Sequence, residues 1–212
     1  MRKVEIDFLG PFGWGAVRTI SSIYDSPIAA KGGVYLWTVL TPGHDELVHY
    51  VGETRRSFAE RIAEEMKDIS VGRSRVYDPD RFVHGQKIRL WGGRFARYRE
   101  TRTKSDFEQI KSKVAQFMEI QRFHLAPVSS EQAGVMPEDE LRLRVEAGLA
   151  HHFYQQEGVV REFQDEDVQY LRGSRLGVQR LENLHWPPVD ATTRVFCHTE
   201  AKIRCFPSEI VV

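Results

Sequence analysis

The sequence lacks the features that mark several large protein classes. It has only two cysteines, Cys197 and Cys205, among 212 residues. A small disulfide-stabilised scaffold needs many more, so we expect reduced thiols and a cytoplasmic location. No apolar run approaches the ~20 residues of a membrane-spanning helix, and Glu5 and Asp7 interrupt the N-terminal segment where a secretory signal would be apolar. These absences favour a soluble protein with no membrane partner.

The formal net charge is zero, because 30 basic and 30 acidic residues cancel. Overall charge therefore gives no sign of a nucleic-acid partner, but the distribution of charge does. From residue 73 to residue 104, ten Lys and Arg residues occur with three acidic residues, and aromatic residues are interleaved. A solvated surface with a satellite core is one interpretation. The other is DNA contact through the phosphates, for which the candidates are Arg73, Arg75, Arg81, Lys87, Arg89, Arg94, Arg97 and Arg99.

Two tripeptides stand in neighbouring β-rich runs. Gly33-Val34-Tyr35 begins the first run, Tyr50-Val51-Gly52 lies in the second, and turn residues at 42–45 separate them. The pattern predicts an antiparallel hairpin that carries one tyrosine on each strand. Each tripeptide alone is ordinary strand sequence, so only their order and spacing are informative.

A helix is predicted directly after the hairpin. Ser57 stands three residues before Glu60, which is a capping-box pattern, and apolar residues then repeat at helical spacing from Phe58 to Lys67. Arg61 borders the apolar stripe of this helix. A charged group at the edge of a core is costly unless it is paired or binds a ligand.

Further elements are predicted on both sides. The alternation of Val4, Ile6 and Phe8 suits a half-buried strand that flanks the core, residues 123–128 form a short buried strand, and residues 194–206 form a C-terminal hairpin. The clearest helix covers residues 138–156. Glu146 borders its apolar stripe, as Arg61 does on the earlier helix.

Taken in order, the two tripeptides, Arg61 and Glu146 resemble the GIY-YIG nucleases. The resemblance implies an α+β fold in which a small three-stranded antiparallel sheet, with the strand at 123–128 as its third, is flanked by helices. We expect one domain over residues 1–212, with a core at about 32–66 and 121–157. The basic insertion at about 70–104 and the C-terminal β-hairpin would be added to it.

The resemblance also implies roles for four residues. Tyr35 would be the general base, Tyr50 would position the water or the phosphate, Arg61 would stabilise the transition state, and Glu146 would bind one Mg²⁺ or Mn²⁺. Such a set covers the tasks of phosphodiester hydrolysis, since a carboxylate holds the cation and a guanidinium binds phosphoryl oxygens. A tyrosine, with an ordinary pKa near ~10, is a poor base unless nearby positive charge lowers that value.

Two features depart from this pattern. Glu65 stands where many relatives carry a histidine one turn after the arginine, which leaves Lys67, His49 or a residue of the insertion for the auxiliary role. Arg142 is spaced to pair with Glu146 at i+4, and such a pair would make Glu146 structural.

The resulting prediction is a metal-dependent endonuclease that hydrolyses double-stranded DNA. The size of the chain favours a restriction enzyme that works as a homodimer on a palindromic site. The alternatives are a non-catalytic DNA-binding module of the same fold and a nuclease of repair or of a mobile element.

Overall fold

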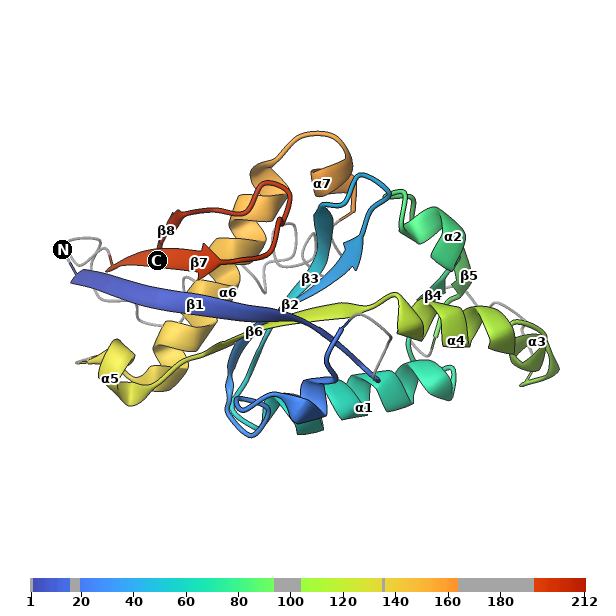
Figure 1. The fold of residues 1–212 in the computed structure, drawn as a ribbon, viewed down its shortest axis with the longest axis horizontal. Helices are drawn as coiled ribbons and strands as arrows, with labels where there is room; N and C mark the ends of the chain where they lie inside the picture. The colour runs from blue at the N-terminus through green and yellow to red at the C-terminus, as the bar shows by residue number, and fades with distance from the viewer. Residues whose placement is uncertain (1, 16–19, 94–103, 135, 164–192) are drawn as a thin grey trace.

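The computed structural model describes residues 2–15, 20–93, 104–134, 136–163 and 193–212, and a mixed six-stranded sheet forms its centre (Figure 1). The strand order is β3-β2-β6-β1-β7-β8. β1 and β7 run parallel, and all other neighbouring pairs are antiparallel. The strands are β1 (Arg2–Gly13), β2 (Gly33–Leu40), β3 (Glu46–Thr54), β6 (Arg122–Pro127), β7 (Thr193–Thr199) and β8 (Glu209–Val211).

The prediction of a small three-stranded antiparallel sheet is wrong, although the protein is α+β. β3, β2 and β6 are neighbours, but β6 also pairs with β1, and β1 pairs with β7. The alternation of Val4, Ile6 and Phe8 identified a strand without naming its partners. All three side chains are buried, and Val4 lies opposite Val195 of β7. Pairing at this sequence separation leaves no local signal, since hydrophobic alternation marks faces and not neighbours.

The C-terminal hairpin also differs from its prediction. β7 pairs with β8, so that Val195 lies opposite Ile210. Ile203 instead forms an isolated bridge with Glu46 at the start of β3. Cys205 has a positive φ of 55° and is exposed, whereas Cys197 is buried, so the two thiols do not face each other across a hairpin.

Eight helical segments and a second, two-stranded sheet accompany the main sheet in the described residues. The small sheet joins β4 (Val76–Tyr77) to β5 (Arg89–Trp91). The helices are η1 (Ile23–Asp25), α1 (Phe58–Ser70), α2 (Pro79–Phe82), α3 (Lys104–Gln109), α4 (Lys111–Glu119), α5 (Ser130–Ala133), α6 (Glu138–Gln155) and α7 (Val159–Glu162). Within the described parts of the chain, no helix combines the length and apolar character needed to cross a membrane.

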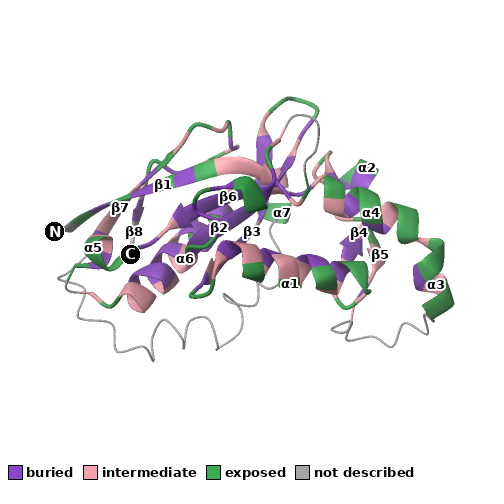
Figure 2. Ribbon diagram, turned by 60° about the horizontal axis from the view of Figure 1, so that its bottom comes forward, coloured by how far each residue is buried: buried purple, intermediate pink, exposed green. Residues whose placement is uncertain are grey.

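Two helices cover the strands that carry the tyrosines. Ser57 caps α1 as predicted, because its hydroxyl accepts a hydrogen bond from the backbone N–H of Glu60 at 3.2 Å. Phe58 of α1 is buried and packs edge-on against Tyr35 of β2. α6 packs against β2 and β3 through its own apolar stripe. Figure 2 shows buried residues along the central strands and exposed residues on the outer faces of the helices. α1 and α6 thus hold Arg61 and Glu146 beside the same hairpin.

Candidate active site

Two glycines allow close packing on the strands that carry the tyrosines. Gly52 of β3 lies opposite Tyr35 of β2, and a Cβ on Gly52 would lie 2.5 Å from Cζ of Tyr35 and 2.7 Å from Cε1 of Tyr50. A Cβ on Gly33 would lie 2.1 Å from the carbonyl oxygen of Ala126. The glycines of both tripeptides are therefore required by the close approach of neighbouring atoms.

The two phenols and Arg61 form one contact group. The rings of Tyr35 and Tyr50 are 6.1 Å apart between centroids. Nε of Arg61 donates a hydrogen bond to the hydroxyl of Tyr35 at 3.2 Å. One turn along α1, Glu65 forms an ion pair with Nη2 of Arg61. Residues from β2, β3 and α1 thus meet at one place.

Glu146 lies close enough to Tyr50 for its charge to act on the phenol. It is half-buried on α6. Burial raises the pKa of Tyr50 well above its ordinary value, and the charges of nearby Tyr35, Glu146 and Glu65 raise it further. We call Tyr35, Tyr50, Arg61 and Glu146 the phenol site.

Arg142 has partners other than the one that the sequence suggested. The side chain is buried, with Nε 3.2 Å from Glu53 and Nη1 2.9 Å from Glu138, while Nη2 contacts Asp139. Glu53 belongs to β3, so this cluster fastens α6 to the strand that carries Tyr50. Arg142 is one turn before Glu146 and helps to place it.

The pKa of Tyr35 is relevant to its expected role as a base. Burial raises this pKa to about 12, although the positive charge of Arg61 and its hydrogen bond lower it. At neutral pH the protein alone therefore keeps Tyr35 protonated. Additional positive charge beside the phenol is needed before it accepts a proton from water.

The oxygen atoms of the phenol site fit a magnesium ion that is held largely by water and substrate. Mg²⁺ is commonly bound through one or two carboxylates together with water and phosphate oxygens. Glu146 supplies one carboxylate, and the two phenols add oxygen atoms nearby. The described residues contain no cluster of three or more His, Cys, Asp and Glu side chains that could hold a metal ion. The donor set thus suits a site with one protein carboxylate and does not suit a fully protein-ligated metal.

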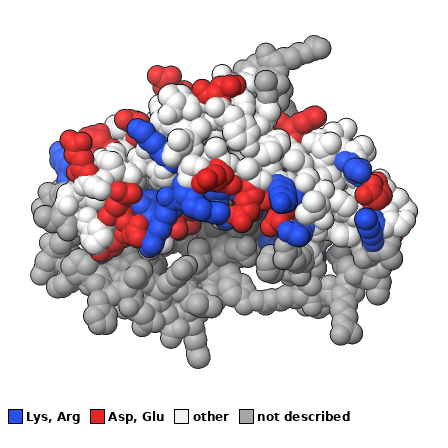
Figure 3. All heavy atoms as spheres, turned by 90° about the horizontal axis from the view of Figure 1, so that it is seen from below, with Lys and Arg blue, Asp and Glu red and all other residues white. Residues whose placement is uncertain are grey.

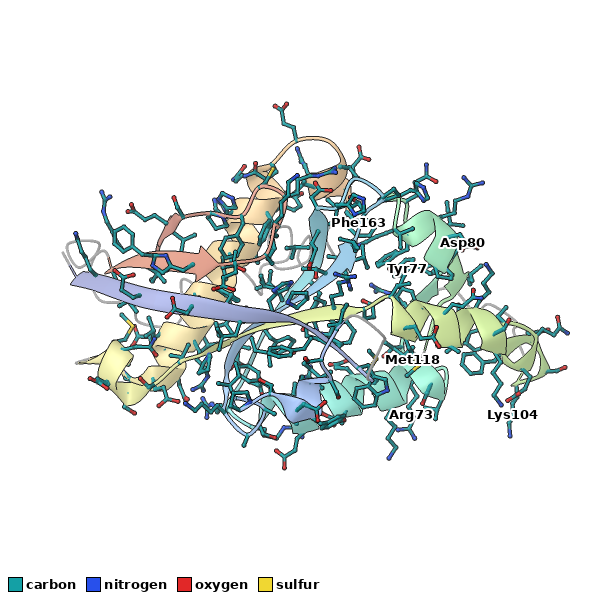
Figure 4. The ribbon with its side chains drawn as sticks, viewed as in Figure 1. Arg73, Tyr77, Asp80, Lys104, Met118 and Phe163 are labelled. Carbon is teal, nitrogen blue, oxygen red and sulfur yellow. The ribbon has the colours of Figure 1, made fainter. Side chains whose placement is uncertain are left out.

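The basic insertion folds partly as a packing unit. Arg81 and Arg89 are exposed and Arg75 is half-buried, while Arg73 is exposed at 3.4 Å from Asp68. Figure 4 shows Arg73 pointing outward near the end of α1. Nζ of Lys87 instead lies over aromatic rings. The three remaining candidates, Arg94, Arg97 and Arg99, lie outside the described residues.

Lys87 borders an aromatic cluster that we define as His49, Tyr77, Phe82, Phe117 and Phe163. Phe82 is fully buried and packs against each of the other four rings. The labels in Figure 4 place Tyr77 and Phe163 at this cluster, and Lys87 lies 5.8 Å and 5.7 Å from their ring centroids. Phe82 is therefore part of the hydrophobic core, and the partly buried Tyr77 packs against it.

His49 does not supply the missing auxiliary group. Its ring is buried, and Nε2 lies 2.7 Å from the side-chain oxygen of Gln121. Burial lowers the pKa of His49 to about 3, assisted by the charge of Lys87. Lys67, the other candidate, is exposed on α1. Glu65, which stands where many relatives carry a histidine, forms an ion pair with Arg61.

The charge on the α1 side of the molecule is mixed. Viewed from that side, basic and acidic side chains lie next to one another (Figure 3). Three ion pairs agree with this view: Arg56 with Glu64, Arg73 with Asp68, and Arg55 with Asp139.

Comparison with family models, with curated proteins and with solved structures finds no match to this chain.

Proposed function

We propose that this protein is a metal-dependent endonuclease that hydrolyses DNA phosphodiester bonds at the phenol site. The observation that carries the proposal is the contact of Tyr35, Tyr50 and Arg61, from three separate elements, with the Glu146 carboxylate within electrostatic range of Tyr50. A half-buried guanidinium beside one buried phenol, one partly buried phenol and two carboxylates is an expensive arrangement for packing alone. The resemblance of these residues to the GIY-YIG nucleases points to the same chemistry.

Each residue has a task that its surroundings support. Arg61 binds phosphoryl oxygens and stabilises the charge that develops on them. Tyr35, after it has lost its own proton to solvent, accepts the proton of the attacking water as a phenolate, and Tyr50 orients that water or the phosphate. Glu146 would hold Mg²⁺ or Mn²⁺, which would supply positive charge to the phosphoryl oxygens and to the phenols. This added positive charge would lower the raised pKa of Tyr35, as the role of a base requires.

Mg²⁺-dependent nicking of a supercoiled plasmid tests the proposal. We expect the wild type to nick and Glu146→Gln to lose cleavage by about 10²-fold or more, since metal binding is removed. Glu157→Gln is the matched control, because Glu157 is exposed just beyond the same helix. Equal activity of wild type and Glu146→Gln would remove Glu146 from the mechanism. DNA binding without cleavage by the wild type would instead indicate a non-catalytic DNA-binding module.

Within this activity, we propose sequence-specific double-strand cleavage by a homodimer, as in a restriction enzyme. The two-fold symmetry of a dimer matches that of a palindromic site. Sequencing the cut ends from a random plasmid library tests this step. Short palindromes at the ends agree with it, whereas cuts at lesions, branches or long asymmetric sites would indicate a repair or mobile-element nuclease.

A further inference from the structure

All three nitrogens of the Arg61 guanidinium have partners. Nε donates to the Tyr35 hydroxyl at 3.2 Å, Nη1 lies 3.3 Å from Glu64, and Nη2 forms the ion pair with Glu65. Arginine binds phosphate by presenting its N–H groups to phosphoryl oxygens. These contacts engage three of the five N–H groups of the guanidinium, so a phosphate binds to the remaining N–H groups or replaces one of the partners.

The two glutamates are unequal partners of Arg61. The side chain of Glu65 is 28% exposed, close to the 27% of Arg61, whereas that of Glu64 is 51% exposed. Glu64 is also shared, since Arg56 forms an ion pair with the same carboxylate oxygen. An exposed, shared contact at 3.3 Å is the weakest of the three and the easiest to replace by phosphate.

Glu65 has a second relation to the phenol site that Glu64 lacks. Its charge acts on Tyr35 and on Tyr50 as well as on Arg61, so the carboxylate lies within range of all three groups. Its position four residues after Arg61 places both side chains on one face of α1, beside β2 and β3. Glu65 is thus built into the site, while Glu64 stands at its rim.

We propose that Glu65 is a positioning residue that holds Nη2 of Arg61, so that Nε stays on Tyr35 and Nη1 is presented to the phosphate in place of Glu64. The inference rests on the proposed nuclease function. Arginine has a long side chain whose rotamer freedom opposes a fixed orientation. Two anchors, Glu65 and Tyr35, remove most of that freedom before substrate binds. Glu64 then acts as an exchangeable partner that competes with DNA.

The two glutamates should therefore give opposite results when each is neutralised. Glu65→Gln should lower kcat on the order of 10- to 100-fold with little change in KM, since a misplacement of about 1 Å is sufficient for such a loss. Glu64→Gln should leave kcat unchanged and lower KM about twofold to fivefold, since a weak exposed competitor for the phosphate is removed. Glu65→Asp keeps the charge and should recover part of the lost kcat.

A double-mutant cycle separates this role from a structural one. Glu65→Gln should cause no further loss of kcat when it is added to Arg61→Ala, because the two residues act as one unit. Thermal unfolding of Glu65→Gln should resemble that of the wild type. Additive losses in the cycle, or equal kcat for Glu65→Gln and wild type, would overturn the inference while leaving the nuclease function in place. A wild type that does not cleave would overturn both.

Discussion

His49 and Tyr50 are consecutive residues of β3 with contrasting surroundings. Tyr50 faces Tyr35 and the charges of the phenol site, whereas His49 lies in the aromatic cluster with Phe82 and Phe163. The register of β3 against β2 shifts at His49, since Trp37 lies opposite Tyr50 and Thr38 lies opposite Val48, and this irregularity lets one strand serve both regions. Burial acts on both residues, but only the phenol site holds an arginine and carboxylates within range. A buried polar group suggests chemistry when charged partners surround it and suggests packing when rings do.

The comparison predicts that the two regions fail in different ways. Damage to the aromatic cluster should lower the free energy of unfolding and spare the rate of cleavage by folded molecules. Damage to the phenol site should do the reverse.

Phe82→Ala should give the largest loss of stability. Removing a fully buried phenylalanine that packs against four rings should lower the free energy of unfolding by about 3 to 5 kcal/mol. Chemical denaturation measures this change. Ile88→Ala is the control, since Ile88 is 54% exposed in the same segment, and its effect should stay within about 0.5 kcal/mol. A loss of cleavage by the folded Phe82→Ala protein would show that the phenol site depends on the aromatic cluster, which would contradict the separation of the two regions.

Arg61→Ala should reduce the single-turnover cleavage rate by about 10²- to 10³-fold, the usual cost of removing a donor to the transition state. Its thermal midpoint should stay close to that of the wild type. Ser70→Ala changes an exposed residue at the end of the same helix and should keep the rate. Equal losses in both variants would point to α1 as a docking surface instead of a catalytic element.

His49 should make stability fall in mild acid. Its pKa is about 3 in the fold, below the ordinary value near 6.5, so the unfolded chain takes up the proton first as the pH drops. The contribution of His49 is complete above pH 6.5 and is lost towards pH 3. It should cost about 2 kcal/mol at pH 5 relative to pH 7. Unfolding measured at both pH values should show a smaller difference for His49→Gln, while the exposed control His44→Asn should behave like the wild type. An unchanged difference in His49→Gln would contradict the burial that we assign to this ring.

The smallest effects are expected from the exposed basic residues. Arg81→Ala and Arg89→Ala should each weaken DNA binding slightly and reduce the slope of log K against log salt by about 1, which is the change expected when a side chain that contacts one phosphate is removed. Fluorescence anisotropy at several salt concentrations gives this slope. Cleavage at saturating protein should not change. A slope equal to that of the wild type would show that these two side chains do not contact phosphate.

Local sequence patterns were sufficient to predict the helices and strands around the phenol site. The hairpin of β2 and β3, the capped start of α1 at Ser57 and the buried stripe of α6 all follow from spacing over a few residues. The approach of Tyr35, Tyr50 and Arg61 could be predicted only from the resemblance, because nothing local joins residues of three elements.

Long-range pairing is what the sequence did not reveal. The alternation of Val195 and Cys197 marks β7 as a strand, but its parallel partner is β1, near the other end of the chain. Ile203 alternates as a strand residue would, yet Ile210 takes the place opposite Val195. The ion pair of Glu65 with Arg61 could be expected from i,i+4 spacing, whereas its relation to the phenols needed the tertiary structure.

The most direct test of the central claim is the single-turnover cleavage rate of Tyr35→Phe, Arg61→Ala and Glu146→Gln, alone and in pairs, with DNA affinity measured in parallel. We predict that each single variant loses cleavage far more than binding, and that pairs lose little more than the worse single variant. Losses that multiply in the pairs, or parallel losses of binding, would contradict a common site for these residues.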